Sequence, residues 1–143
     1  MSNEVAPSNA RPSRVVIDTN VLVSWFLSPQ GSPAQVVGLA TVGIVVPCFD
    51  ARMMAEYQAV LSRPRFQIDP QAVRKTLEAF HTHGLTVMAI PSAAQLVDES
   101  DRPFIEVAQT TRAWLVTGNL KHFTGLDFAV SPAAFLRILS GMS

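Results

Sequence analysis

Short apolar runs alternate along the chain with longer segments in which apolar residues recur every three or four positions. Short runs are typical of buried strands, and the longer period is typical of helices that bury one face. We expect strands at residues 14–17, 43–46, 85–90 and 114–117, and a weak edge strand at residues 127–130. We expect helices at residues 21–27, 33–41, 51–63, 70–83, 102–112 and 132–139. This alternation predicts an α/β fold with a mostly parallel central sheet of about five strands.

Polar residues mark the starts of several expected helices. Asp50 precedes the helix expected at residues 51–63, whereas Asp69 and Ser131 each precede a proline at a first helical position. Aspartate and serine side chains accept hydrogen bonds from the free N–H groups of a first helical turn, and proline loses no hydrogen bond there. The sequence therefore defines helix starts better than helix ends.

Length and composition favour one folded unit. The chain has 143 residues, of which 48% are hydrophobic, which is enough for a single core. Residues 1–13 contain two prolines and no long apolar run, so we expect a disordered tail there. A single domain is expected over residues 14–143.

Charge and cysteine content narrow the functional classes. Lysine and arginine together number 11, as do aspartate and glutamate, so the net charge is zero and RNA binding would need a local basic patch. No apolar segment approaches the roughly 18 residues that a membrane span needs, so no membrane association is expected. Cys48 is the only cysteine and lies in an apolar run. Because it has no partner for an intrachain disulfide, we expect a cytoplasmic location.

Three acidic residues interrupt apolar patterns where a carboxylate would face the protein interior. Asp18 follows the apolar run 15–17 and so lies at the carboxyl end of a strand, where open α/β sheets bind ligands. Glu56 lies at the margin of the apolar stripe of its helix, and Asp101 heads the apolar face of another. An ionised carboxylate beside a core has to be paired or bound to a metal. The three acids are therefore candidate metal ligands.

Each acid also has a local explanation. Asp18 suits the start of a turn with Thr19 and Asn20, Glu56 suits a solvated helix flank, and Asp101 suits a helix cap. For any single acid, local structure is the stronger explanation. The metal-site prediction depends on their joint arrangement.

Four segments of the chain, in the same order, resemble the motifs of PIN domains. Residues 16–23, which include Asp18-Thr19-Asn20, resemble the opening motif. Residues 56–66 resemble the second-acid helix of the PIN group that contains toxin components of toxin–antitoxin systems. Residues 101–108 and 115–123 resemble the last two motifs. The similarity runs from about residue 14 to the C-terminus, and the ordered combination is specific where one motif would be weak.

The resemblance implies a three-layer α/β/α fold around a parallel sheet. It also implies a Mg²⁺- or Mn²⁺-dependent ribonuclease that cuts single-stranded RNA and leaves 5′-phosphate and 3′-hydroxyl ends. Such cations take oxygen ligands, and a bound cation lowers the pKa of a water that attacks phosphorus. VapC-like relatives pair with a small antitoxin protein, and a homodimer or higher homo-oligomer is expected on the same grounds.

Asn119 occupies the position at which many PIN domains have a fourth acid. Its amide oxygen is a neutral and weaker ligand, so the site has one negative charge fewer and the number of bound ions stays open. The expected catalytic and metal-binding residues are Asp18, Glu56, Asp101 and Asn119. Asp98, three residues before Asp101, is an alternative source of the fourth carboxylate.

Neighbouring polar residues are expected to support this site. Thr19 and Thr117 follow strands, so we expect their hydroxyls to orient a carboxylate or a water. Asn20 is expected to brace the turn that positions Asp18, although capping or turn formation explains all three residues equally well. Four basic residues adjoin the acid-bearing segments and are candidate RNA contacts, with solubility as the alternative for each: Arg63, Arg65, Arg102 and Lys121.

Other ionisable residues near the motifs are expected to lie outside the site. Glu99 and Glu106 fit solvated helix faces, and His122 fits an exposed turn better than a substrate contact. His81 and His83 occupy alternate positions, which do not share a helical face, so a metal site there is not expected.

Competing functions with a strand-end aspartate fit less well. A haloacid-dehalogenase-like phosphatase requires a second aspartate two positions after the first, where this chain has Asn20. A response-regulator-like receiver requires an acidic pair before its first helix and a lysine after a late strand, and the sequence has neither. The alternative that stays open is a catalytically weak or inactive PIN domain that binds RNA or protein, which Asn119 and the zero net charge favour.

Overall fold

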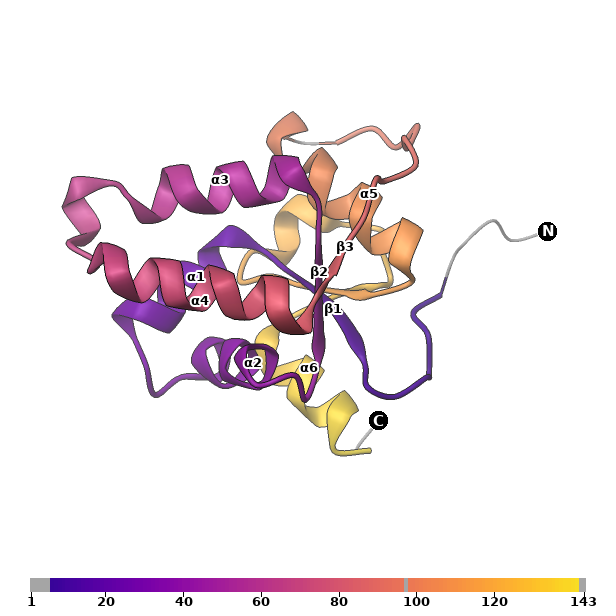
Figure 1. Ribbon diagram of the computed structural model, residues 1–143. Helices are drawn as coiled ribbons and strands as arrows, with labels where there is room; N and C mark the ends of the chain where they lie inside the picture. The colour runs from indigo at the N-terminus through magenta and orange to yellow at the C-terminus, as the bar shows by residue number, and fades with distance from the viewer. Residues whose placement is uncertain (1–5, 97, 142–143) are drawn as a thin grey trace.

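The computed structural model, which describes residues 6–96 and 98–141, contains a five-stranded parallel sheet with helices packed against it (Figure 1). The strands are β1 (Arg14–Ile17), β2 (Val46–Phe49), β3 (Leu85–Thr86), β4 (Trp114–Val116) and β5 (Ala129–Val130). The α-helices are α1 (Thr19–Leu27), α2 (Ser32–Thr41), α3 (Ala51–Leu61), α4 (Pro70–His83), α5 (Arg102–Thr111) and α6 (Pro132–Leu139). Three short 3-10 turns are η1 (Pro64–Phe66), η2 (Glu99–Asp101) and η3 (Leu120–Phe123). The predicted α/β class and parallel sheet are confirmed.

The strand order is β3-β2-β1-β4-β5. Helices α1 to α4 lie on one side of the sheet, and α5 packs on the other side against β1, β2 and β4 (Figure 1). Right-handed crossovers produce this arrangement because the chain moves outward from β1 to β3 and then crosses back to β4. The connections therefore reverse direction between β1 and β4. At the carboxyl ends of two such strands, an open α/β sheet has a crevice suited to a ligand.

The central strand β1 is buried, and a tyrosine secures its end. The side chains of Val15 and Ile17 are at most 1% exposed. The hydroxyl of Tyr57 on α3 donates a hydrogen bond to the carbonyl of Ile17. The ring of Tyr57 packs near those of Phe80 and Phe104, with centroids 6.1 and 6.2 Å away. Because a buried tyrosine hydroxyl needs a polar partner, this contact sets α3 across the end of β1.

The predicted caps are confirmed, and some helix ends shift. The side-chain oxygens of Asp50, Asp69 and Ser131 accept hydrogen bonds from the backbone N–H groups of Met53, Gln71 and Ala134, at 2.9, 2.9 and 3.1 Å. Helix α1 begins at Thr19, two residues earlier than expected, because Asp18 caps it. Helix α5 ends at Thr111 because Arg112 adopts a left-handed backbone conformation with φ 55°.

The strand predicted at residues 43–46 is wrong in position, because β2 covers Val46–Phe49. Gly43 has φ 81° and lies in the turn after α2, and the side chain of Ile44 is 60% exposed. The ladder begins where the N–H of Val46 donates to the carbonyl of Ser13 at 2.8 Å. Apolar content alone therefore placed the strand three residues too early.

The strand predicted at residues 85–90 is wrong in length. β3 comprises Leu85–Thr86, and the last ladder contact is the N–H of Val87 donating to the carbonyl of Phe49 at 3.0 Å. Beyond it, Met88 and Ile90 are 95% and 70% exposed. β3 pairs with β2, and β2 ends at Phe49, the partner of Thr86. The apolar residues after Val87 therefore have no strand with which to pair. The edge strand expected at residues 127–130 is confirmed as β5, with a later start.

Part of the expected N-terminal tail lies outside the described residues, namely residues 1–5. Within the described part, the N–H of Ser8 donates to the carbonyl of Arg112 at 2.9 Å. Among the described helices, none combines the length and the apolar character that crossing a membrane requires.

Candidate metal centre

Asp18 directly follows β1 and is held by two hydrogen bonds at the reversal point of the sheet. Its Oδ1 accepts from the N–H of Thr19 at 2.9 Å, and its Oδ2 accepts from the hydroxyl of Thr117 at 2.7 Å. Thr117 follows β4, the neighbour of β1, and is fully buried. Asp18 itself is 8% exposed. The two parallel strands therefore fix this carboxylate in one orientation.

The environment of Asp18 disfavours its negative charge. Burial is the main cause that raises the pKa of Asp18 from 3.8 to about 6. The hydrogen bonds from Thr117 and Thr19 act in the opposite direction, whereas the negative charges of Asp101 and Glu56 raise the pKa further. Perturbed acids of this kind occur at functional sites. A divalent cation would supply the positive charge that this group lacks.

Thr19 connects Asp18 to the second acid. Its hydroxyl donates to Oε2 of Glu56 at 2.6 Å, while its N–H holds Asp18. Glu56 precedes Tyr57, so the contact that sets α3 across the end of β1 also positions Glu56. Thr19 is 6% exposed. Its expected role in orienting a carboxylate therefore has a direct geometric basis.

The loop after β4 is tied to the start of α1. The side-chain oxygen of Asn20 accepts from the N–H of Gly118 at 3.1 Å, and the hydroxyl oxygen of Thr117 accepts from the N–H of Asn119 at 3.0 Å. Asn20 thus braces the segment that leads to Asn119, a role that its position in the opening motif did not reveal. These contacts place Asn119 beside the loop that holds Asp18.

We predict that Thr117→Val weakens the binding of Mg²⁺ by about tenfold or more, because residues that orient metal ligands typically contribute 10–100-fold to affinity. The change keeps the shape of the side chain but removes the hydrogen bond to Asp18. It also raises the pKa of Asp18, since that hydrogen bond lowers it. Titration of Mg²⁺ by calorimetry measures the affinity. Thr41→Val, at the half-buried end of α2, is the control, and equal affinities for both variants would contradict the role of Thr117.

Asp101 lies where η2 meets α5 and contacts a histidine. Its carboxylate makes no capping hydrogen bond to α5. Oδ2 of Asp101 lies 3.1 Å from Nδ1 of His122, which η3 carries. His122 therefore lies on a turn, as expected, but its side chain is half-buried beside Asp101 and not fully exposed. Burial raises the pKa of Asp101, and the charge of His122 lowers it.

Asp98 lies close to Asp101 and His122. Its Oδ1 accepts from the N–H of Ser100 at 2.9 Å, and this hydrogen bond lowers the pKa of Asp98. Ligand atoms of Asp98, Asp101 and His122 all lie within 4.8 Å of one another. Among the described residues, no other trio of acidic, histidine or cysteine side chains is as tightly grouped.

Asp18, Glu56 and Asp101 are thus spaced more widely than that trio. Ligands on opposite sides of one Mg²⁺ lie about 4.2 Å apart, and Mg²⁺ usually keeps several waters. Some of the three acids would therefore contact a shared ion through water. The mutual effects of their charges on the pKa of Asp18 place them in one electrostatic neighbourhood.

The four candidate RNA contacts lie in different surroundings. Lys121 is exposed on η3, between Asn119 and His122. Arg63 and Arg65 are exposed beyond the C-terminal end of α3, which Figure 1 shows away from the sheet. Arg102 donates to Glu99 and to the carbonyls of Ser92 and Ala94, at 2.7, 2.8 and 2.9 Å. The guanidinium of Arg102 therefore holds the loop before η2, whereas Lys121 is exposed on the turn that also carries His122.

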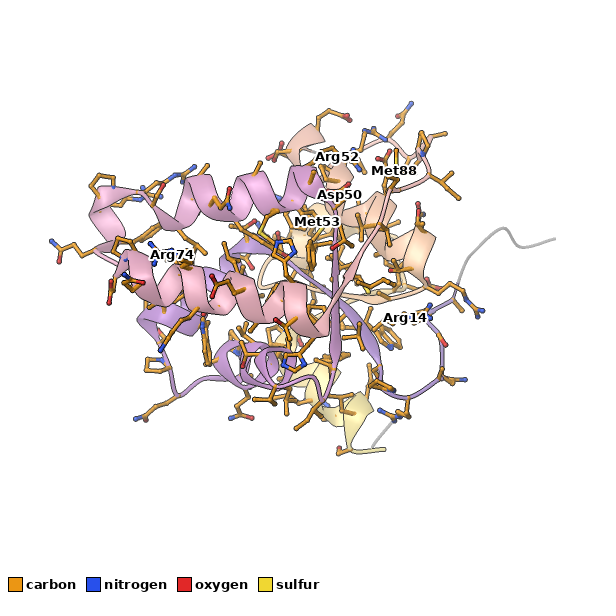
Figure 2. All side chains as sticks on the ribbon, viewed as in Figure 1. Arg14, Asp50, Arg52, Met53, Arg74 and Met88 are labelled. Atoms are coloured by element: carbon orange, nitrogen blue, oxygen red, sulfur yellow. The ribbon has the colours of Figure 1, made fainter. Side chains whose placement is uncertain are left out.

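Glu106 is buried, so its expected place on a solvated face is wrong. It is 5% exposed and forms an ion pair of 2.9 Å with Arg52, which also pairs with Asp50 at 2.8 Å. Figure 2 shows Arg52 beside Asp50 at the start of α3. The N–H of Ser92 also donates to Glu106 at 2.8 Å. Periodicity could not reveal this burial, because loop residues 91–96 cover that face of α5.

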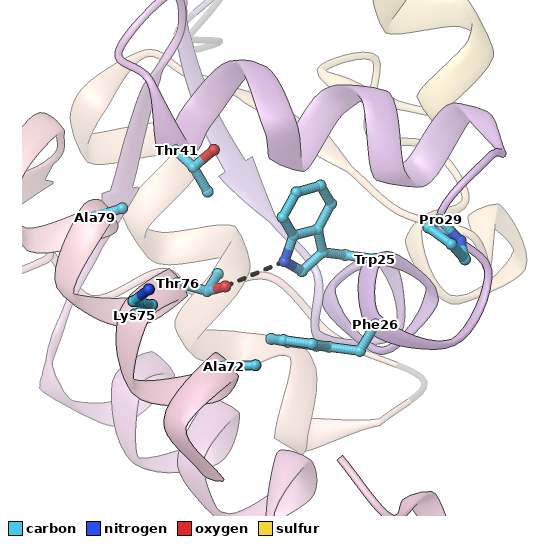
Figure 3. Close-up of a pocket in the computed structure, with 8 residues that line it drawn as sticks. All are labelled: Trp25, Phe26, Pro29, Thr41, Ala72, Lys75, Thr76 and Ala79. Atoms are coloured by element: carbon cyan, nitrogen blue, oxygen red, sulfur yellow. Dashed lines mark hydrogen bonds between the residues drawn. The ribbon is translucent and has the colours of Figure 1, made fainter. Parts of the chain in front are cut away.

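A separate apolar hollow of about 480 Å³ lies between α1, α2 and α4 (Figure 3). Trp25 and Phe26 form much of its lining, and the indole N–H of Trp25 donates to the hydroxyl of Thr76 at 3.1 Å. Lys75 is the charged residue among those that line it. Because no acid or histidine lines this hollow, it is distinct from the candidate metal centre.

Comparison with known proteins identifies the family. The family model described as PIN domain matches residues 14–121. The chain belongs to the PIN-domain family. An uncharacterized protein of Methanocaldococcus jannaschii is 27% identical over 109 residues, which cover 74% of this chain and 70% of that protein. PIN domains are generally nucleases that use divalent metals, and the four candidate ligands of this PIN domain all lie within the matched segment.

The donor set of this PIN domain fits a divalent cation. Asp18, Glu56, Asp101 and Asn119 offer oxygen atoms, the ligands that Mg²⁺ and Mn²⁺ prefer. Burial, and to a smaller extent the charges of Asp101 and Glu56, raise the pKa of Asp18, and a bound cation would offset these effects. A bound cation would neutralise charge on a phosphate oxygen and make a nearby water more acidic.

Proposed function

We propose that this PIN domain is a Mg²⁺- or Mn²⁺-dependent endoribonuclease that hydrolyses phosphodiester bonds of single-stranded RNA. The observation that carries the proposal is the placement of Asp18, which is buried, oriented by Thr19 and Thr117, and located where the sheet connections reverse. A carboxylate held in this way is preorganised for a cation, so little reorganisation is needed during the reaction.

Each residue of the site has a role in this proposal. Asp18, Glu56, Asp101 and Asn119 hold the cation, directly or through water. Thr19 and Thr117 keep the carboxylates in position through hydrogen bonds of 2.6 to 2.9 Å. Asn20 holds the loop after β4. Lys121 binds an RNA phosphate from the adjoining turn, and Arg63 and Arg65 extend the contact toward more distant phosphates.

The biological setting that we propose is a cytoplasmic toxin–antitoxin pair. The support is the resemblance of residues 56–66 to the toxin-component group of PIN domains. In this setting a small antitoxin protein covers the acids, and the enzyme forms a homodimer or higher homo-oligomer. The buried free thiol of Cys48 fits a reducing compartment.

The test is cleavage of unstructured RNA by the purified, antitoxin-free protein. We expect cleavage with Mg²⁺ or Mn²⁺, none with EDTA, and products with 5′-phosphate ends. Glu56→Gln should lower the rate about tenfold or more, because it removes a charge that stabilises the cation and hence the transition state. Glu78→Gln, on the exposed face of α4, is the matched control.

A binding module is the second candidate function, because Asn119 lowers the negative charge of the site. Metal-independent RNA binding, with no cleavage of any pooled RNA by either cation, would favour this function over the nuclease. Cleavage that Glu56→Gln leaves unchanged would contradict the proposed site.

A further inference from the structure

Asp101 has two ionisable neighbours that the proposed nuclease site does not use. His122 approaches Oδ2 of Asp101 through Nδ1 at 3.1 Å, and Asp98 completes a trio whose ligand atoms all lie within 4.8 Å of one another. Asp98 caps the turn η2 and Asp101 ends it, whereas His122 comes from η3, 21 residues after Asp101. The fold therefore brings together three side chains of the types that bind metals.

The carboxylate of Asp101 is mostly buried and contacts one other side chain, that of His122. Asp101 is 8% exposed and heads α5, yet it accepts no hydrogen bond from the N–H groups of that helix. Its Oδ1 accepts no hydrogen bond from any residue in the described part of the chain, and its Oδ2 contacts only His122 there. A buried carboxylate is costly unless it is paired or bound to a metal. The side chain of Asp101 is 12% exposed, so an ion from solvent can reach this carboxylate.

The spacing in the trio suits ligands of one ion. Two ligands bound at about 2.1 Å and at right angles lie about 3.0 Å apart, close to the distance of 3.1 Å between Asp101 and His122. Ligands on opposite sides of an ion lie about 4.2 Å apart. Asp98 is exposed, so its side chain has room to turn toward an ion when the hydrogen bond from Ser100 is released.

We propose that Asp98, Asp101 and His122 form a second divalent-cation position that is selective for first-row transition-metal ions. Imidazole binds such ions more readily than it binds Mg²⁺, because Mg²⁺ prefers oxygen ligands. The two positions share Asp101, and the second ion compensates for the neutral Asn119. Participation of this ion in RNA cleavage rests on the proposed function, whereas its binding does not.

Binding of Mn²⁺ to the full chain tests this proposal without any measurement of cleavage. Pulsed electron paramagnetic resonance detects ¹⁴N bonded directly to Mn²⁺, and we expect this signal in the wild type. His122→Gln should abolish it, although glutamine still offers a hydrogen bond to Asp101. His83→Gln, at the exposed end of α4, is the matched control and should retain the signal.

Calorimetry provides a second measurement that does not depend on histidine. Asp98→Asn lies at an exposed position and should weaken one Mn²⁺ site about tenfold or more, since even residues beyond the direct ligands contribute 10–100-fold. Mg²⁺ should compete poorly with Mn²⁺ at this site. The circular dichroism spectrum and melting temperature of each variant establish that it is folded.

Two results would overturn the proposal: no ¹⁴N signal in the wild type, or a signal that His122→Gln leaves intact. An Asp98→Asn variant with unchanged Mn²⁺ affinity would also overturn it. Metal-dependent RNA cleavage without nitrogen coordination would refute this second site and leave the nuclease intact. Nitrogen coordination without RNA cleavage would support the second site and refute the nuclease.

Discussion

Asp18→Asn should lower the rate of RNA cleavage at least about 100-fold, the scale expected when one group that stabilises transition-state charge is removed. Asparagine has nearly the same shape and can still accept the hydrogen bond from Thr19. The change therefore removes the negative charge while it largely keeps the geometry. Initial rates at saturating Mn²⁺ measure the effect.

The same variant should be more stable than the wild type in the absence of metal. The pKa of Asp18 is raised from 3.8 to about 6, so the folded chain holds this proton between about pH 4 and 6 while the unfolded chain releases it. Stability therefore falls as the pH rises through this window and becomes flat above about pH 7. Over this window, the free energy of unfolding of the wild type falls by roughly 3 kcal/mol.

Denaturant unfolding at pH 4 and pH 7 tests whether the stability of the wild type falls as the pH rises. The stability advantage of Asp18→Asn should be small at pH 4 and should reach up to roughly 3 kcal/mol at pH 7. Added Mg²⁺ should stabilise the wild type more than the variant, because it binds the folded wild type more tightly. Asp127→Asn, at an exposed loop position, is the control. An active Asp18→Asn enzyme would remove Asp18 from the site.

Gly84→Ala should destabilise the fold by about 3 kcal/mol, the upper part of the range for overpacking. A Cβ atom on Gly84 would lie 2.3 Å from the backbone carbonyl oxygens of both Phe80 and Pro47. Backbone on two sides cannot move away as a flexible side chain can. Gly84 thus allows the end of α4 to approach β2 closely as the chain enters β3. Chemical denaturation measures the loss, or a failure to fold shows it directly.

Gly38→Ala is the matched control within the same fold. A Cβ atom at this position would be 3.6 Å from Trp25, an ordinary contact distance. Because Gly38 lies inside α2, alanine should stabilise the protein by about 0.5–1 kcal/mol. Equal effects of the two substitutions would show that the close approach at Gly84 is unimportant.

The sequence predicted much of the fold because local signals dominate it. Short apolar runs and helical periodicity were enough for the α/β class, and Asp50, Asp69 and Ser131 cap the helices as expected. The strand at residues 43–46 was misplaced because a run of apolar residues does not record where a partner strand begins. The register with β1 decides that, and it starts at Val46.

The candidate acids were recognisable because each interrupts an apolar pattern. The order of the motifs also identified the family, which the match over residues 14–121 confirms. The surroundings of the acids were not recognisable. Glu106 was taken for a solvated residue, and its ion pair with Arg52 depends on how α5 packs beside the start of α3.

The sequence by itself therefore determined the type and order of the α-helices and strands, the caps at Asp50, Asp69 and Ser131, and the places of the three acids along them, since these depend on near neighbours along the chain. The tertiary structure decided which side chains meet. Thr117 reaches Asp18 across 99 residues of sequence, and His122 reaches Asp101 across 21. The first contact arises because β1 and β4 are neighbours in the sheet, and the second arises because the turns η2 and η3 lie close together. No local sequence pattern encodes either contact.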